Sequence, residues 1–206
     1  MRFTYFKAQL KDFIVFTLND IRKVEPEFHR RRLNEWQDKG LIKKIRRDHY
    51  MFSDTPLNEQ ALFLVANHLY PPSYVSFEAA LSFYGLIPEG VYSITSASSR
   101  KTAHFRTSIA DFQYHRIKPS LFFGYRLDSY QGQWYKMAVM EKAVLDYLYL
   151  NPGIADEADF HEWRFNSRDF LAKADLTKLR RYATAFGSKL LSTRLEKMLA
   201  LMIKTG

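Results

Sequence analysis

The densest group of chemically active side chains in the sequence is a basic stretch between His29 and Arg47. Eight Lys and Arg residues are accompanied there by only two acidic residues, a local charge of +6 in a chain whose formal net charge is +9. The basic residues are Arg30, Arg31, Arg32, Lys39, Lys43, Lys44, Arg46 and Arg47. Arginine pairs with guanine edges, and both cations bind phosphate, so charge this concentrated is typical of a nucleic-acid-binding surface.

The residues around the basic stretch predict the elements that present it. Thr17 with Asp20 has the spacing of a capping box, which predicts a helix over Leu18–Val24. Proline suits the first turn of a helix, so a second helix is predicted over Pro26–Lys39, ended by a glycine. A hairpin rich in basic residues follows between Leu41 and Phe52. Helix, turn, helix and hairpin in this order predict a winged helix-turn-helix.

On a helical wheel of the second helix, Leu33, Trp36 and His29 gather on the face expected to pack on the core. The opposite face is expected to enter a major groove and read base edges. Arg31, Asn34 and Glu27 lie on this face with Arg30 at its flank, and Arg30, Arg31 and Asn34 are expected to enter the groove. The other basic side chains of the helix and hairpin are expected to support DNA binding, the wing cations through phosphate contacts that give affinity rather than discrimination. They are Arg32, Lys43, Lys44, Arg46, Arg47 and His49.

A run of arginines is often only a solvated helix face, and by itself it does not favour DNA binding over that interpretation. The order of the elements around the run does favour DNA binding. A capped short helix, a proline turn, a helix with a basic outer face and a basic hairpin succeed one another in fixed order.

A second basic group lies between residues 100 and 118, where five cations accompany one acidic residue, Asp111. The cations are Arg100, Lys101, Arg106, Arg116 and Lys118, with His104 and His115 among them. Three interpretations stay open: an extension of the DNA footprint, a site for an acidic toxin or an RNA, and an ordinary basic sheet face.

Composition narrows the class of protein. The sequence pI of about 9.6 favours a polyanionic partner. The absence of cysteine excludes disulfides, thiolate zinc sites and cysteine nucleophiles. No apolar run approaches the roughly 20 residues of a spanning helix, so we predict a soluble, cytoplasmic protein without membrane contact.

The sequence contains no recognisable catalytic or metal-binding motif. The acidic cluster Asp156–Glu162 lacks the spacing of an EF-hand or a zinc motif, and neither GxSxG, a Walker A loop nor GxGxxG occurs. We therefore predict no catalytic residues, no metal, no cofactor and no enzymatic activity.

The turn-rich segment Ser53–Pro56 predicts a domain boundary, with residues 1–54 as the DNA-binding domain and 55–206 as a second domain. Alternating segments between Val91 and Val139 predict a small, largely antiparallel sheet, followed by a helix over Met140–Leu150 and further C-terminal helices. The expected fold class is α+β. An apolar stripe in the last helix fits either packing within the chain or a homodimer seam, which would allow a dimer on DNA; it comprises Leu191, Leu195, Met198 and Met202.

Three segments of the second half, Pro72–Thr102, Phe112–Tyr125 and Met140–Leu150, together resemble the AbiEi-type antitoxin family of bacterial abortive-infection, type IV toxin–antitoxin systems. That family also begins with a winged helix-turn-helix, so the resemblance covers most of the chain. One departure lies in the wing turn, where Arg47 is followed by Asp48 and family members commonly have glycine.

The resemblance implies a mixed α/β antitoxin-type domain after the winged helix. It implies a transcriptional repressor that binds double-stranded DNA at the promoter of its own operon. The functional partner implied is a nucleotidyltransferase-type toxin, with direct contact left open. The alternative is a protein–protein module that neutralises the toxin by direct contact, with DNA binding secondary.

Overall fold

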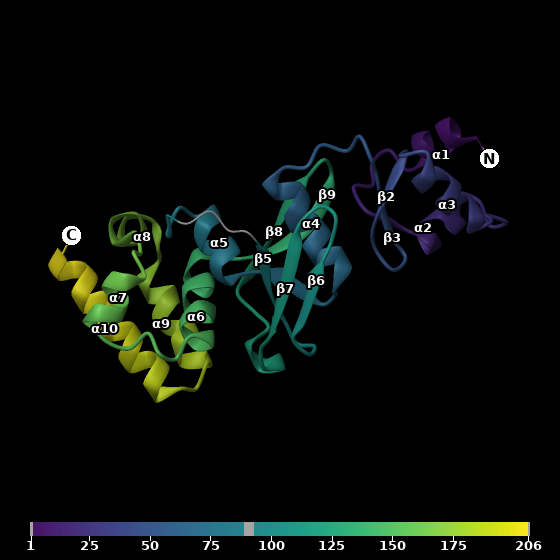
Figure 1. The fold of residues 1–206 in the computed structure, drawn as a ribbon. Helices are drawn as coiled ribbons and strands as arrows, with labels where there is room; N and C mark the ends of the chain where they lie inside the picture. The colour runs from purple at the N-terminus through teal and green to yellow at the C-terminus, as the bar shows by residue number, and fades with distance from the viewer. Residues whose placement is uncertain (1, 89–92, 206) are drawn as a thin grey trace.

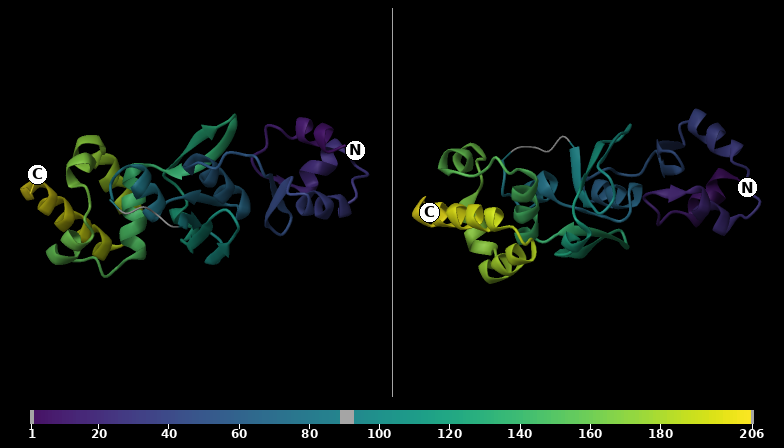
Figure 2. Two further views of the ribbon diagram at one scale, coloured as in Figure 1. Left: turned by 45° about the horizontal axis from the view of Figure 1, so that its top comes forward. Right: turned by 90° about the horizontal axis from the view of Figure 1, so that it is seen from below.

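The computed structural model describes residues 2–88 and 93–205, and within them the chain is α+β, with ten α-helices and two sheets (Figure 1). Three parts follow one another along an elongated molecule. A small sheet with the first helices lies at the N-terminal end, a larger sheet lies in the middle, and a group of helices lies at the C-terminal end (Figure 2).

The first part, called here the N-terminal unit (residues 3–52), contains three helices and an antiparallel sheet with strand order β1-β3-β2. Its elements are α1 Phe3–Gln9, β1 Phe16–Thr17, α2 Leu18–Val24, α3 Arg31–Asp38, β2 Ile42–Arg46 and β3 His49–Phe52. The predicted capping box is confirmed at α2. The Thr17 hydroxyl accepts from the backbone N–H of Asp20, whose carboxylate accepts from the backbone N–H of Thr17 at 2.9 Å.

Helix α3 is shorter than predicted, because it begins at Arg31, five residues after Pro26. The segment before it is a loop that packs Phe28 into the core, with its ring centroid 5.6 Å from that of Trp36. His29, expected to face the core, is exposed. The prediction of a helix from Pro26 was wrong because burying Phe28 requires a backbone path that a continuous helix does not supply.

The hairpin that follows α3 is present, and it contains an irregularity. The register of β2 against β3 shifts between Lys44 and Arg46, so that Ile45 is an extra residue on β2. Such a bulge re-aims the neighbouring side chains. At the turn, Asp48 has a φ of 60°, the left-handed conformation that glycine adopts most easily.

The middle part is a six-stranded sheet with the order β6-β7-β5-β4-β9-β8. Its elements are α4 Glu59–Leu69, β4 Ser73–Val75, α5 Phe77–Phe83, β5 Ser93–Ser98, β6 Ala103–Arg106, β7 Asp111–Arg116, the 3-10 turn η1 Pro119–Leu121, β8 Tyr125–Tyr130 and β9 Gln133–Ala138. The pairs β4–β9 and β5–β7 are parallel and the other three are antiparallel. The sheet is therefore mixed and larger than the small, largely antiparallel one predicted. The start of one predicted strand, Val91–Tyr92, lies outside the described residues.

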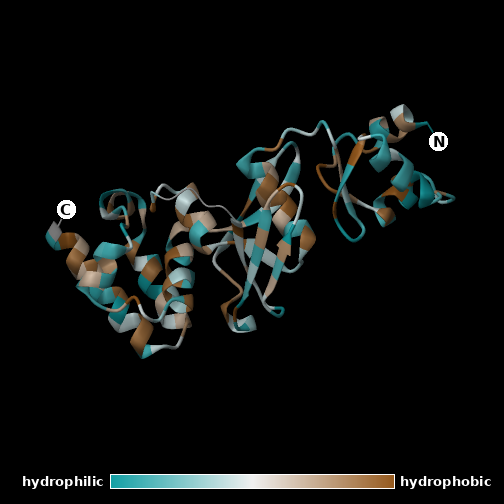
Figure 3. Ribbon diagram, viewed as in Figure 1, coloured by the Kyte–Doolittle hydropathy of each residue, from teal (hydrophilic) through white to brown (hydrophobic). Residues whose placement is uncertain are grey.

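The C-terminal part consists of helices. They are α6 Met140–Leu150, as predicted, α7 Glu157–Glu162, α8 Ser167–Lys173, α9 Leu176–Ala185 and α10 Lys189–Thr205. Apolar segments recur along α10 (Figure 3). The four residues of the predicted stripe on this helix are all buried in the core of the same chain, so they pack within it.

Buried apolar side chains form three clusters. The first lies inside the N-terminal unit, the second between α4 and one face of the six-stranded sheet, and the third between the other face and the C-terminal helices. Four residues of the N-terminal unit belong to the second cluster: Ile14, Val15, Ile45 and Met51. The N-terminal unit therefore packs directly against the body of the molecule.

The three tryptophans are distributed over these parts. Trp36 is buried in the first cluster, and Trp163 packs against the third. Trp134 lies on the outer hairpin β8–β9, where 63% of its surface is exposed. Leu127, on the same face of that hairpin, is also exposed.

Helix α6 carries a fully buried ion pair between Lys142 and Asp146. The ammonium donates to the Tyr74 hydroxyl at 2.7 Å, and Tyr74 and Ser76 donate to the Asp146 carboxylate at 2.9 and 2.8 Å. Burial lowers the pKa of Lys142 and raises the pKa of Asp146, while each charge favours the ionised form of the other. The hydrogen bonds satisfy a pair that has no access to water.

Candidate nucleic-acid interface

The outer face of α3 is set by what its inner face buries. Leu33 and Trp36 are buried, and the Trp36 ring lies 4.5 Å from that of Phe6, centroid to centroid. This packing leaves Arg31 and Asn34 exposed on the outside of the helix. A guanidinium and an amide on one exposed helix face supply the donors and acceptors that recognise guanine and adenine edges.

Arg30 immediately precedes the helix and joins it to the hairpin turn. Its guanidinium Nη2 lies 3.0 Å from Oδ1 of Asp48, and Nε of Arg47 lies 3.8 Å from the other oxygen of the same carboxylate. All three side chains are well exposed, and exposed ion pairs contribute little free energy. Phosphate can therefore replace the carboxylate. His49 lies beside them, with Nδ1 2.9 Å from the backbone oxygen of Arg47.

Strand β2 presents the side chains of Lys43 and Lys44 to solvent, and Arg32 on α3 is half-buried. Lys43 and Lys44 are neighbours in the strand, so their side chains leave opposite faces of the small sheet. Arg32, Lys43 and Lys44, together with Arg30, Arg31, Asn34 and Arg47, are called here the helix–hairpin surface. The residues that the sequence proposes for DNA contact thus lie on α3, directly before it or on the hairpin, and each of them is exposed or half-buried.

Arg46 differs from the others. Its guanidinium carbon lies 3.6 Å from the ring centroid of Phe105 on β6, and its Nη1 donates to the backbone oxygen of Leu69 at 3.1 Å. The bulge at Ile45 precedes it and turns the end of β2 toward the six-stranded sheet. Arg46, expected to contact phosphate, is engaged within the chain, so we leave it out of the helix–hairpin surface.

The second basic group is divided in space. Strands β5 and β7 are parallel with Ser98 opposite Arg116, so the residues just beyond both strands lie at one end of the sheet. Four exposed cations gather there: Arg100, Lys101, Arg116 and Lys118. Arg106 pairs in register with Asp111, at the other end of β6, and is separate from them.

Two histidines lie near this group. His104 Nε2 is 3.3 Å from a carboxylate oxygen of Asp111. His115 is half-buried, with its ring 5.1 Å from that of Phe77, and burial lowers its pKa while Glu78 acts in the opposite direction. The neutral imidazole of His115 is thus favoured, and this residue adds less positive charge than the sequence suggested.

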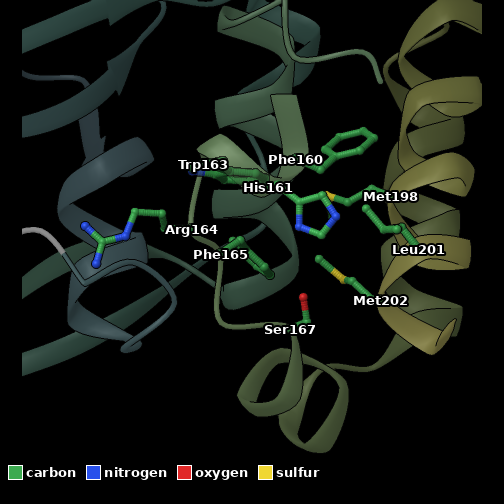
Figure 4. A pocket seen from close by; sticks show the side chains of 9 residues that line it. All are labelled: Phe160, His161, Trp163, Arg164, Phe165, Ser167, Met198, Leu201 and Met202. Atoms are coloured by element: carbon green, nitrogen blue, oxygen red, sulfur yellow. The ribbon is translucent and has the colours of Figure 1, made fainter. Parts of the chain in front are cut away.

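A pocket of about 140 Å³ lies away from these surfaces, between α7 and α10 (Figure 4). Its lining combines aromatic and methionine side chains with three polar residues, His161, Arg164 and Ser167. Over residues 2–88 and 93–205, no group of three or more histidine and acidic side chains is arranged to hold a metal ion.

None of the helices formed by the described residues is both long and apolar enough to span a bilayer. The sequence matches no model of a known protein family, and a search of curated proteins gives no match.

The sequence did not predict two contacts of the candidate interface, those of Asp48 and Phe105, nor the buried ion pair of α6. Asp48 was noted only as a departure in the turn, although an acidic residue between basic neighbours signals an ion pair. Nothing in the sequence indicated the contact of Phe105 with Arg46, because the two residues are far apart in the chain. The Lys142–Asp146 pair had a partial signal, since its i,i+4 spacing indicates an ion pair on one face of a helix but does not indicate that the pair is buried.

Proposed function

We propose that the chain is a cytoplasmic, sequence-specific DNA-binding protein whose N-terminal unit acts as a winged helix-turn-helix. One observation carries the proposal. Helix α3, the residue before it and the β2–β3 hairpin carry seven polar and basic side chains that are exposed or half-buried, beside the carboxylates of Glu35 and Asp38 on α3 and of Asp48 at the turn. Arg31 and Asn34 would read bases in a major groove, and Lys43, Lys44 and Arg47 would bind phosphate as a wing.

The biological role proposed is repression of its own operon, combined with antitoxin activity toward a nucleotidyltransferase-type toxin. Support comes from the resemblance of Pro72–Thr102, Phe112–Tyr125 and Met140–Leu150 to AbiEi-type antitoxins. The proposal assigns no catalytic step to the chain.

The test is fluorescence anisotropy with a labelled duplex from immediately upstream of the gene and a scrambled duplex as control, each over a series of salt concentrations. Neutralising about five phosphates gives a log–log salt slope of about −4 to −5. We expect the upstream duplex to bind at least about a hundredfold more tightly than the scrambled one. Equal, salt-sensitive binding to both duplexes would reduce the surface to a non-specific basic patch.

A second function, direct protein contact, is favoured by one observation. Leu127 and Trp134 expose large apolar surfaces on the same face of the outer hairpin β8–β9, with 57% and 63% of their surface accessible. Exposed apolar side chains at a sheet edge suit a protein partner. A pull-down with the product of the neighbouring gene tests this function, since a stoichiometric complex that Trp134→Ala disrupts would establish it.

A further inference from the structure

Arg46 is turned in a different direction from the other cations of its strand. Lys43 and Lys44 are exposed, whereas Arg46 is partly buried against the six-stranded sheet. Its planar guanidinium lies over the Phe105 ring at 3.6 Å and also donates to the backbone oxygen of Leu69 at the end of α4. A cation over a ring with a hydrogen bond at its edge is a directional contact, so it fixes orientation as well as position.

The contact continues through two rings to the second basic group. The Phe105 ring meets Tyr70 edge-on with centroids 5.5 Å apart, and Tyr70 lies under the Arg100 guanidinium at 4.1 Å. Nη1 of Arg100 also donates to the backbone oxygen of Pro71 at 3.1 Å, but Arg100, unlike Arg46, remains exposed to solvent. The Tyr70 hydroxyl donates to the backbone oxygen of Lys101 at 2.9 Å. One chain of contacts therefore links Arg46 in the hairpin to the exposed β5–β6 turn that carries Arg100 and Lys101.

We propose that Arg46 is a positioning residue, which holds the N-terminal unit on the sheet so that the helix–hairpin surface and the Arg100–Lys101 turn meet one duplex as a single rigid surface. In Figure 1 the β2–β3 hairpin lies on the side of the six-stranded sheet where β6, the strand that carries Phe105, is the outermost strand. The inference rests on the proposed DNA binding and deepens it, because it names the residue that sets the length of the DNA footprint.

The apolar contacts between the two parts do not fix this orientation alone. Ile14, Val15, Ile45 and Met51 pack into the second cluster, but hydrophobic contact is non-directional. Arg46 supplies a directional contact at the rim, in addition to the hydrogen bond that the Gln133 side-chain amide on β9 donates to the backbone oxygen of Asp12. Its effect on DNA binding is preorganisation, because the Arg100–Lys101 turn is already placed when the helix–hairpin surface binds.

The experiment compares a long upstream duplex with versions trimmed from each end by one helical turn, about 10 base pairs. Each phosphate contact adds about 0.9 to the magnitude of the log–log salt slope. For the wild-type chain we expect a slope steeper by about 2 on the long duplex than on the shorter one, and tighter binding to the long duplex.

The variants separate positioning from direct contact. Arg46→Gln and Phe105→Leu are expected to lose the advantage of the long duplex while retaining the affinity for the short one. Phe105→Tyr retains the ring and is expected to retain the advantage. Lys101→Gln is expected to lose part of the tighter binding to the long duplex. Lys44→Gln is the matched control on β2, and it is expected to weaken binding to both lengths equally. Thermal unfolding of each variant confirms that it is folded.

Three outcomes would overturn the inference. If Arg46→Gln weakened both lengths equally, Arg46 would be a phosphate contact. If wild type bound the two lengths with the same slope, the joint surface would not exist. If wild type bound every duplex no better than a scrambled one, the proposed function itself would fail, and the inference with it. The first two outcomes leave sequence-specific binding intact, so the two failures are distinguishable.

Discussion

The N-terminal unit and helix α6 both carry Lys or Arg close to Asp, but they place these charges in opposite surroundings. The ion pairs of Arg30 and Arg47 with Asp48 are exposed to water. The Lys142–Asp146 pair has no exposed surface at all and is enclosed by Tyr74, Ser76 and aromatic rings.

The difference shows which charges are available to a partner. An exposed cation keeps its water until a ligand replaces it, so its contribution appears in binding. A buried pair loses its water on folding, and removing one member leaves an uncompensated charge in the interior, so its contribution appears in stability. Formal charge in the sequence does not distinguish these two roles, whereas burial does.

The largest effect is expected from breaking the buried pair. Lys142→Met should destabilise the fold by about 3–5 kcal/mol, because Asp146 is left without its cation. The double variant Lys142→Met with Asp146→Leu should recover most of that loss. Urea denaturation at neutral pH measures all three free energies of unfolding.

The control is the exposed pair Asp169–Lys173, also spaced i,i+4 on a helix and 2.7 Å apart. Lys173→Met should cost less than about 1 kcal/mol. Similar losses for Lys142→Met and Lys173→Met would remove the contrast between buried and exposed charge.

The next effect concerns the outer face of α3. Arg31→Ala or Asn34→Ala should cost about 1–3 kcal/mol of binding free energy at one base position and leave the other positions of the site unchanged. Anisotropy with a panel of single-base operator variants measures this. A uniform loss over the whole panel would mean that these side chains contact the backbone of the DNA instead.

A smaller effect is expected on β2. Lys43→Gln and Lys44→Gln should each reduce the magnitude of the log–log salt slope by about 0.9, equally on specific and scrambled DNA. If these variants and those of α3 behaved alike on both duplexes, the division between base reading and phosphate binding would be wrong.

The smallest effect is expected at the hairpin turn. Asp48→Asn removes the carboxylate that holds Arg30 and Arg47, and should change the free energy of unfolding by less than about 1 kcal/mol. DNA affinity should rise, because the guanidinium groups of Arg30 and Arg47 no longer have to leave the Asp48 carboxylate before they bind phosphate. Weaker binding would show that the ion pair preorganises the turn for DNA.

Local signals predicted local structure well. The capping box of Thr17 with Asp20 predicted the start of α2, and the helix predicted over Met140–Leu150 has the bounds of α6. Proline at the first helical position misplaced the start of α3, since burial of Phe28 outweighed that preference.

The pairing of strands that are distant in the chain could not be predicted from the sequence. Strand β4 has only three residues, and its parallel partner β9 comes some sixty residues later, so neither length nor alternation indicated the mixed sheet. In the candidate site, residue types predicted which side chains belong to the helix and hairpin. They did not predict that Arg46 turns inward, because this depends on a bulge and on a phenylalanine of another sheet.

The distribution of the three tryptophans provides the protein with its own spectroscopic probes. Trp36 lies in the buried cluster of the N-terminal unit, Trp134 in water on the outer hairpin, and Trp163 against Tyr147, with ring centroids 4.7 Å apart, in the C-terminal part. Their emission maxima and their quenching by iodide should therefore differ. Variants that retain one indole each would report separately on the three parts, and show in which order the parts open as denaturant is added.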